Sequence, residues 1–66
     1  MKITVNGEMK EVKEGLLVTD LLEAIGMPAL GIAVELNREI VPKSQHGSTV
    51  LKEDDNLEIV KMVGGG

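Results

Sequence analysis

The chain has 66 residues, 42% of them hydrophobic, and a formal net charge of −4. This length allows one domain with one modest core, and the hydrophobic content argues against disorder. The acidic charge argues against a nucleic-acid partner, and the lack of cysteine excludes disulfides and thiolate chemistry.

No apolar run in the sequence approaches the roughly 20 residues that a membrane-spanning helix requires. A strand pattern begins directly after Met1, without a signal peptide before it. We therefore expect a cytoplasmic protein without a membrane partner.

The N-terminal part of the chain predicts a β-hairpin. Residues 2–5 alternate polar and β-branched apolar side chains, which is typical of a strand. Asn6 and Gly7 tolerate the positive φ angles of a tight turn, and residues 8–13 return as a polar edge strand.

A helix is predicted over residues 16–25. Its apolar side chains recur at the spacing of one helix face, at Val18, Leu21, Leu22 and Ile25. Thr19 is the expected N-cap, and Gly26 is the expected first residue beyond the helix.

Three further strands are predicted in the second half of the chain. They cover residues 31–36, 39–41 and 57–63, with a turn at Asn37 and Arg38 between the first two. An irregular segment, which ends in an acidic turn, separates the last two strands.

The order of these elements predicts an α+β fold. We expect one mixed sheet of four to five strands with one helix packed across one face, reached by a right-handed crossover between the second and third strands. The predicted core is aliphatic, because the chain has no aromatic residue, and comprises Ile3, Val5, Val18, Leu21, Leu22, Ile25, Val34, Leu57 and Ile59.

The polar residues do not form a recognisable catalytic or metal-binding pattern. Ser44, His46 and Ser48 lie close in sequence, but no acid is placed to orient the histidine. The acidic turn at residues 53–56 lacks the spacing and central glycine of a calcium loop, so we expect a solvated turn. Such a domain is more typical of a binding or carrier module than of an enzyme.

The sequence ends in Gly64, Gly65 and Gly66 after an alternating strand. Glycine has no Cβ, so three in a row can pass through a narrow channel in a partner. We expect a folded domain at residues 1–63 and a flexible tail at residues 64–66, with the terminal carboxylate of Gly66 as the reactive group.

The last strand also predicts a docking surface. Side chains alternate along a strand, so if Leu57 and Ile59 face the helix, Val60 and Met62 face solvent. We expect these two side chains to lie beside Ala33 and to contact a partner.

Several segments together resemble the ThiS family of sulfur carriers of thiamine biosynthesis. They are the run at residues 33–42, the acidic turn at 53–56, the ending at 57–66, the early Asn6-Gly7 turn and the helix start at 18–22. The resemblance covers essentially the whole chain. The spacing A-x-x-x-N-x-x-I-V-P together with a terminal Gly-Gly is its most specific part.

This resemblance implies a ubiquitin-like β-grasp fold and a carrier that is not itself an enzyme. It implies that a ThiF-type enzyme adenylates Gly66 with ATP, and that a sulfur donor protein then supplies the sulfur of a thiocarboxylate. A ThiG-type thiazole synthase would receive that sulfur. The carrier would need no cofactor or metal of its own.

Two alternatives stay open at this point. One is a related carrier on the same fold that serves molybdopterin synthesis or another sulfur-transfer pathway. The other is a β-grasp interaction module whose glycine tail is inert.

Overall fold

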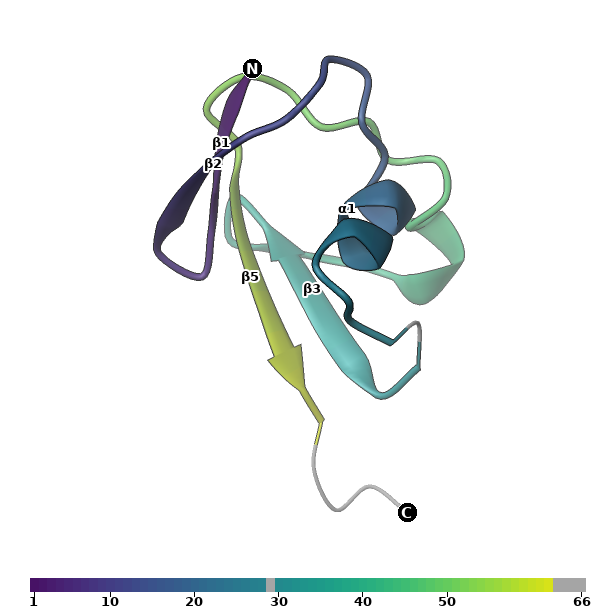
Figure 1. Ribbon diagram of the computed structural model, residues 1–66. Coiled ribbons are helices and arrows are strands. Elements are labelled where there is room, and N and C mark those ends of the chain that lie inside the picture. The colour runs from purple at the N-terminus through teal and green to yellow at the C-terminus, as the bar shows by residue number, and fades with distance from the viewer. Residues whose placement is uncertain (29, 63–66) are drawn as a thin grey trace.

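The computed structural model describes residues 1–28 and 30–62. This part of the chain forms a mixed sheet of five strands with one α-helix across one face (Figure 1). The elements are β1 (Lys2–Val5), β2 (Glu8–Glu11), α1 (Val18–Ala24), β3 (Ile32–Leu36), β4 (Glu39–Val41), the short 3₁₀-helix η1 (Lys43–Gln45) and β5 (Asn56–Lys61). The predicted order of elements and the predicted fold class are confirmed.

The strands lie in the order β2-β1-β5-β3-β4, so the last strand of the chain occupies the centre of the sheet. β5 runs parallel to β1 and antiparallel to β3, and each outer strand is antiparallel to its neighbour. It follows that β2 and β3 run in the same direction. Helix α1 connects them across one face of the sheet, where its apolar side can be buried.

Two tight turns set the register of the hairpins. Asn6 and Gly7 have φ angles of 50° and 82°, and Asn37 and Arg38 have φ angles of 52° and 73°. Positive φ at both central residues defines the turn type that matches the twist of antiparallel strands. Both turns therefore lie where the sequence predicts them.

The N-terminus of α1 differs from the prediction. Leu17 is the N-cap, and Thr19 lies within the helix, so the expectation that Thr19 caps it was wrong. The backbone N–H of Leu17 donates to Asp20 Oδ2 at 3.1 Å. The first helical N–H groups donate to carbonyls of a distant loop, Val18 to Thr49 at 3.1 Å and Thr19 to His46 at 3.2 Å. Tertiary contacts thus replace a side-chain cap.

Helix α1 ends at Ala24 with Ile25 as its C-cap, and Gly26, with a φ of 77°, is the first residue beyond it, as predicted. Gly26 N–H donates to the Glu23 carbonyl at 3.1 Å, and Met27 N–H donates to the Leu22 carbonyl at 2.9 Å. This pair of bonds is a Schellman motif, which satisfies carbonyls that the helix leaves free and brings the residue after the glycine back over the last turn.

The core lies between α1 and the sheet. The buried apolar side chains are Ile3, Val5, Leu16, Val18, Leu21, Leu22, Ile32, Val34, Val41, Leu51, Leu57 and Ile59. All the predicted core residues are among them except Ile25, which is only partly buried and packs against the edge of the cluster. Ile25 is the C-cap of the helix, so the chain turns away there.

The acidic turn is not fully solvated, contrary to expectation. Asp55 is buried, and its two carboxylate oxygens accept hydrogen bonds from Asn37 Nδ2 at 3.0 Å and from the backbone N–H of Lys52 at 2.7 Å. The turn therefore joins the β3–β4 hairpin to the beginning of β5. Among the residues described, no helix combines the length and the hydrophobicity needed to span a bilayer.

Candidate functional site

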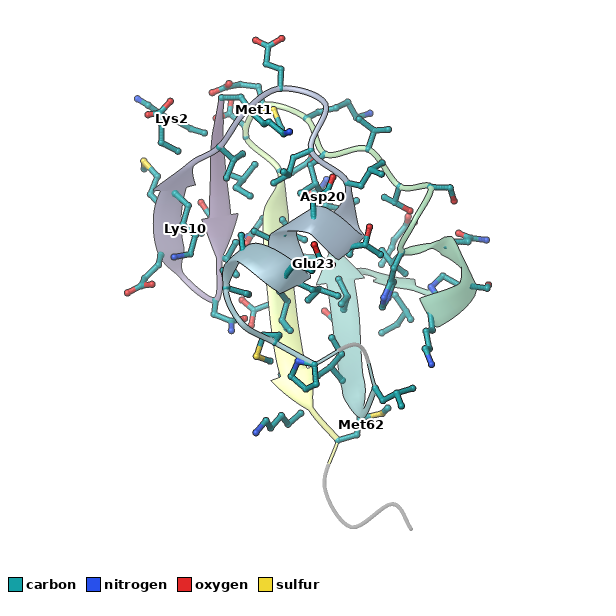
Figure 2. All side chains as sticks on the ribbon, turned by 45° about the vertical axis from the view of Figure 1, so that its right-hand side comes forward. Met1, Lys2, Lys10, Asp20, Glu23 and Met62 are labelled. Atoms are coloured by element: carbon teal, nitrogen blue, oxygen red, sulfur yellow. The ribbon has the colours of Figure 1, made fainter. Side chains whose placement is uncertain are left out.

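The predicted site is at the C-terminal end of β5. Together, β3 and β5 extend beyond the β1–β2 hairpin, so this end of the sheet projects from the body of the molecule (Figure 1). Met62 lies at the opposite end of the molecule from Met1 (Figure 2). The predicted tail residues Gly64, Gly65 and Gly66 lie outside the described residues.

Three side chains at this end form what we call the apolar patch, Ala33, Val60 and Met62. Ala33 and Val60 are directly opposite each other in the antiparallel register of β3 and β5. Val60 is 53% exposed, Met62 is 60% exposed and Ala33 is partly buried. The alternation along β5 explains this, because Leu57 and Ile59 face α1 and are buried.

The backbone holds the apolar patch at the end of the sheet. Met62 N–H donates to the Gly31 carbonyl at 2.8 Å, which continues the β3–β5 pairing beyond the last ladder residue, Lys61. Leu30, which precedes Gly31, is 68% exposed at the same end. Leu30 was not predicted from the sequence as part of this surface. It lies in the segment between α1 and β3, which has no periodic pattern that would place its side chain on a face.

Two carboxylates adjoin the apolar patch. Glu35 and Glu58 are directly opposite each other on β3 and β5, one pleat away from the Ala33–Val60 pair, and both are exposed. The ion pairs among the described residues, Met1–Glu11 and Lys10–Glu8, involve neither of them. This end of the sheet therefore combines apolar side chains with negative charge, which complements a basic, partly apolar partner surface.

The polar residues that could suggest catalysis form hydrogen bonds to different backbone carbonyls and not to one another. His46 Nε2 donates to the Val41 carbonyl at 3.1 Å, and Ser48 Oγ donates to the Gln45 carbonyl at 3.4 Å. Within residues 1–28 and 30–62, no group of three or more His, Cys, Asp or Glu residues is arranged to hold a metal ion. The apolar patch at the end of β5 can bind a partner, and a partner bound there would lie next to the segment that follows β5.

Comparisons with known proteins agree with this architecture. The model of the ThiS family matches residues 3–66. A crystal structure of the thiamine biosynthesis protein ThiS from Geobacter metallireducens superposes with a TM-score of 0.87, at 36% identity, with all of both chains covered.

A thiazole synthase and a sulfur carrier protein are among the curated relatives that match over all 66 residues of this chain. The thiazole synthase of Paramagnetospirillum magneticum is 41% identical, and the chain spans 20% of the length of that protein. The sulfur carrier protein ThiS of Escherichia coli is 27% identical, and the whole of both chains is covered. From the family match and the shared fold, we conclude that the chain belongs to the ThiS family.

Proposed function

We propose that the protein is a sulfur carrier of thiamine biosynthesis, and that Gly66 carries the sulfur as a terminal thiocarboxylate. The observation that carries this proposal is the match with E. coli ThiS from end to end of both chains. It accords with an exposed apolar patch that lies only a few residues before the glycines.

The chemistry requires an activated carboxylate. A free carboxylate is a poor electrophile, so one oxygen of Gly66 first attacks the α-phosphorus of ATP and pyrophosphate leaves. Hydrosulfide released by the sulfur donor protein then attacks the carbonyl carbon and AMP leaves, which gives the thiocarboxylate. Every catalytic group belongs to the partner enzymes, and the carrier contributes recognition and reach. Three extended glycines span roughly 10 Å.

We propose three protein partners: a ThiF-type adenylating enzyme, a sulfur donor protein and a ThiG-type thiazole synthase. The thiazole synthases of two bacteria, 41% and 39% identical to this chain over a fifth of their length, support a relation between carrier and synthase. The apolar patch, with Glu35 and Glu58 beside it, is the proposed docking surface. Association with a basic partner should then weaken as salt is raised.

The test is ATP–pyrophosphate exchange catalysed by the cognate adenylating enzyme. We compare the full chain with a chain that lacks Gly66 and a chain with one alanine added after Gly66. Deletion moves the carboxylate about 3.5 Å from the nucleotide, and a misplacement of about 1 Å can cost on the order of a hundredfold in rate. Both variants should lose exchange and keep the stability of the full chain. Equal exchange by all three would favour the inert-tail module.

Two expectations from the sequence stay predictions. The division into a domain at residues 1–63 and a flexible tail at residues 64–66 falls partly outside the described residues, and backbone relaxation by NMR would test it. A cytoplasmic location would be checked by fractionation of the source cells. The intact mass of the natural protein would show whether one terminal oxygen is exchanged for sulfur.

A further inference from the structure

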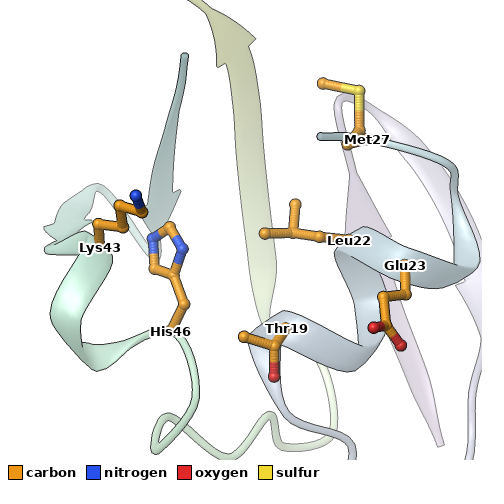
Figure 3. A pocket seen from close by; sticks show the side chains of 6 residues that line it. All are labelled: Thr19, Leu22, Glu23, Met27, Lys43 and His46. Atoms are coloured by element: carbon orange, nitrogen blue, oxygen red, sulfur yellow. The ribbon is translucent and has the colours of Figure 1, made fainter. Parts of the chain in front are cut away.

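A cavity lies on the helix side of the sheet, away from the apolar patch. Its volume is about 210 Å³, and it opens between α1 and η1 (Figure 3). The residues that line it are Thr19, Leu22, Glu23, Met27, Lys43 and His46. Leu22, Met27 and the imidazole of His46 form its interior, while the charged groups of Glu23 and Lys43 come from exposed positions on opposite sides.

The walls of the cavity are held together by hydrogen bonds. The Schellman motif at the end of α1 places Met27 back over Leu22. At the other end of the helix, Thr19 N–H donates to the His46 carbonyl at 3.2 Å. The hydroxyl of Thr49 donates to the Gln45 carbonyl at 2.7 Å and fixes the turn that follows η1. The cavity is therefore already formed in the free protein.

One side chain that lines the cavity has a polar atom without a hydrogen-bond partner among the described residues. His46 is only 5% exposed, and Nε2 must carry a hydrogen because its partner, the Val41 carbonyl, can only accept. Nδ1 forms no hydrogen bond with any described residue. Among the described residues, however, every fully buried side-chain nitrogen or oxygen atom has a hydrogen-bond partner. Nδ1 is therefore not fully buried, and its residue lines the cavity. Figure 3 shows the ring between Lys43 and Leu22, with one nitrogen on the side of Leu22.

These properties select the occupant. The volume is below the roughly 300 Å³ at which pockets for whole small-molecule ligands begin, so the cavity suits a single side chain. Its apolar walls favour an aromatic ring, and methionine sulfur makes favourable contacts with ring edges. In the neutral ring with Nε2 protonated, Nδ1 is an acceptor, so the occupant should carry a donor. Tyrosine combines an apolar body with one such group and is common at interfaces.

We propose that this cavity receives a tyrosine side chain from a partner protein, with the phenol hydroxyl donating to His46 Nδ1. The proposal goes beyond sulfur carriage and assigns a second docking surface. Val60 faces solvent on the side of the sheet opposite to α1, and no residue of the apolar patch lines the cavity. One partner can therefore hold the apolar patch while another occupies the cavity.

The test is an NMR titration of the full chain with phenol and, separately, with toluene. The two probes have the same shape, but only phenol carries a donor. We expect phenol to shift the His46 Nδ1 resonance and the amides of Thr19, Leu22 and Met27. Phenol should bind roughly two- to tenfold more tightly than toluene, the range of one net hydrogen bond. Tighter or equal binding of toluene would mean a purely apolar cavity and would overturn the proposal, as would the absence of shifts at these residues.

A control on the opposite face separates this inference from the proposed function. Val60→Asp should leave phenol binding unchanged, and phenol should still bind when the carrier is held by its adenylating enzyme. If Val60→Asp or the bound enzyme abolishes phenol binding, the two surfaces are not independent and the second docking surface is refuted. None of these readouts depends on sulfur transfer, so failure of either proposal can be recognised without the other.

Discussion

The side chain of Asn6 holds the backbone of Ile59 on β5 by two hydrogen bonds. Oδ1 accepts from the Ile59 N–H at 2.8 Å, and Nδ2 donates to the Ile59 carbonyl at 3.1 Å. The ladder between β1 and β5 ends at the pair Val5 and Leu57, where the chain turns into β2. The amide of Asn6 offers the same donor and acceptor as another strand residue, so it prolongs the parallel pairing after the backbone of β1 has left.

Asn6→Ala should therefore destabilise the fold by about 1–3 kcal/mol, because both backbone groups of Ile59 lose their partner. The measurement is the free energy of unfolding in urea. Asn6→Asp is the matched control, since it keeps the acceptor and removes the donor, and it should fall between alanine and the parent chain. Identical midpoints for all three chains would contradict the role of this clamp.

Leu22→Ala should cost roughly 2–5 kcal/mol of stability, because it leaves a hole between helix and sheet. Leu22 is 4% exposed, and a domain of this size has little stability to spare. Thermal unfolding followed by circular dichroism would measure the effect. Val50→Ala, at a position that is 51% exposed, should change stability by less than about 0.5 kcal/mol. A similar small change at Leu22 would show that the helix face is assigned wrongly.

Arg38→Gly should stabilise the protein by about 0.5–1 kcal/mol. Arg38 has a φ of 73°, and this left-handed conformation costs a residue with a Cβ roughly 1–2 kcal/mol. Glycine avoids this cost, but its greater conformational freedom in the unfolded chain offsets part of the gain. Asn37→Gly is the contrasting variant and should lose stability, because asparagine tolerates positive φ and its side chain donates to the buried Asp55. The denaturation midpoints of the two variants would measure both effects. A loss of stability in Arg38→Gly would contradict the backbone strain inferred at Arg38.

Val60→Asp and Met62→Asp should each weaken binding to the adenylating enzyme by at least about tenfold, because a carboxylate would be buried against an apolar partner surface. Both side chains are more than half exposed, so the fold should be unaffected. Isothermal titration calorimetry would measure the affinity. Met9→Asp, on β2 and 72% exposed, is the matched control and should bind normally. Normal binding by both patch variants would remove the apolar patch from the proposed docking surface.

Glu58→Lys should raise stability by about 0.2–1 kcal/mol, because like charges at opposed strand positions repel and opposite charges attract. The gain should shrink in high salt. Glu14→Lys changes the net charge equally at an exposed loop position and controls for the overall charge. If both variants gain the same stability, the effect arises from net charge and not from the Glu35–Glu58 pair.

Local features of the fold could be predicted from the sequence. The two turns follow from residues that tolerate positive φ, and the helix follows from the spacing of its apolar residues and from Gly26 at its end. The strand that carries Val60 was recognised by its alternation, which is sufficient to place Leu57 and Ile59 on one face. These signals are short-range, and they depend on few residues at a time.

Long-range features could not be predicted, because they depend on strand order. Asp55 is buried where the β3–β4 turn brings Asn37 against it. Thr19 lies inside α1, and its N–H donates to the carbonyl of His46, which is distant in sequence. Glu35 and Glu58 face each other only once β5 is placed beside β3. No periodicity in the sequence reveals these neighbours.

Strand β5 is the last of the described strands in chain order and is also the central strand of the sheet. Before residues 56–61 emerge from the ribosome, the chain can form two hairpins, β1 with β2 and β3 with β4. These hairpins do not pair with each other, because β5 lies between them in the sheet. A lone hairpin is marginally stable at best in water. A prematurely terminated chain that lacks β5 would therefore have no sheet, and defective copies would be left to proteolysis.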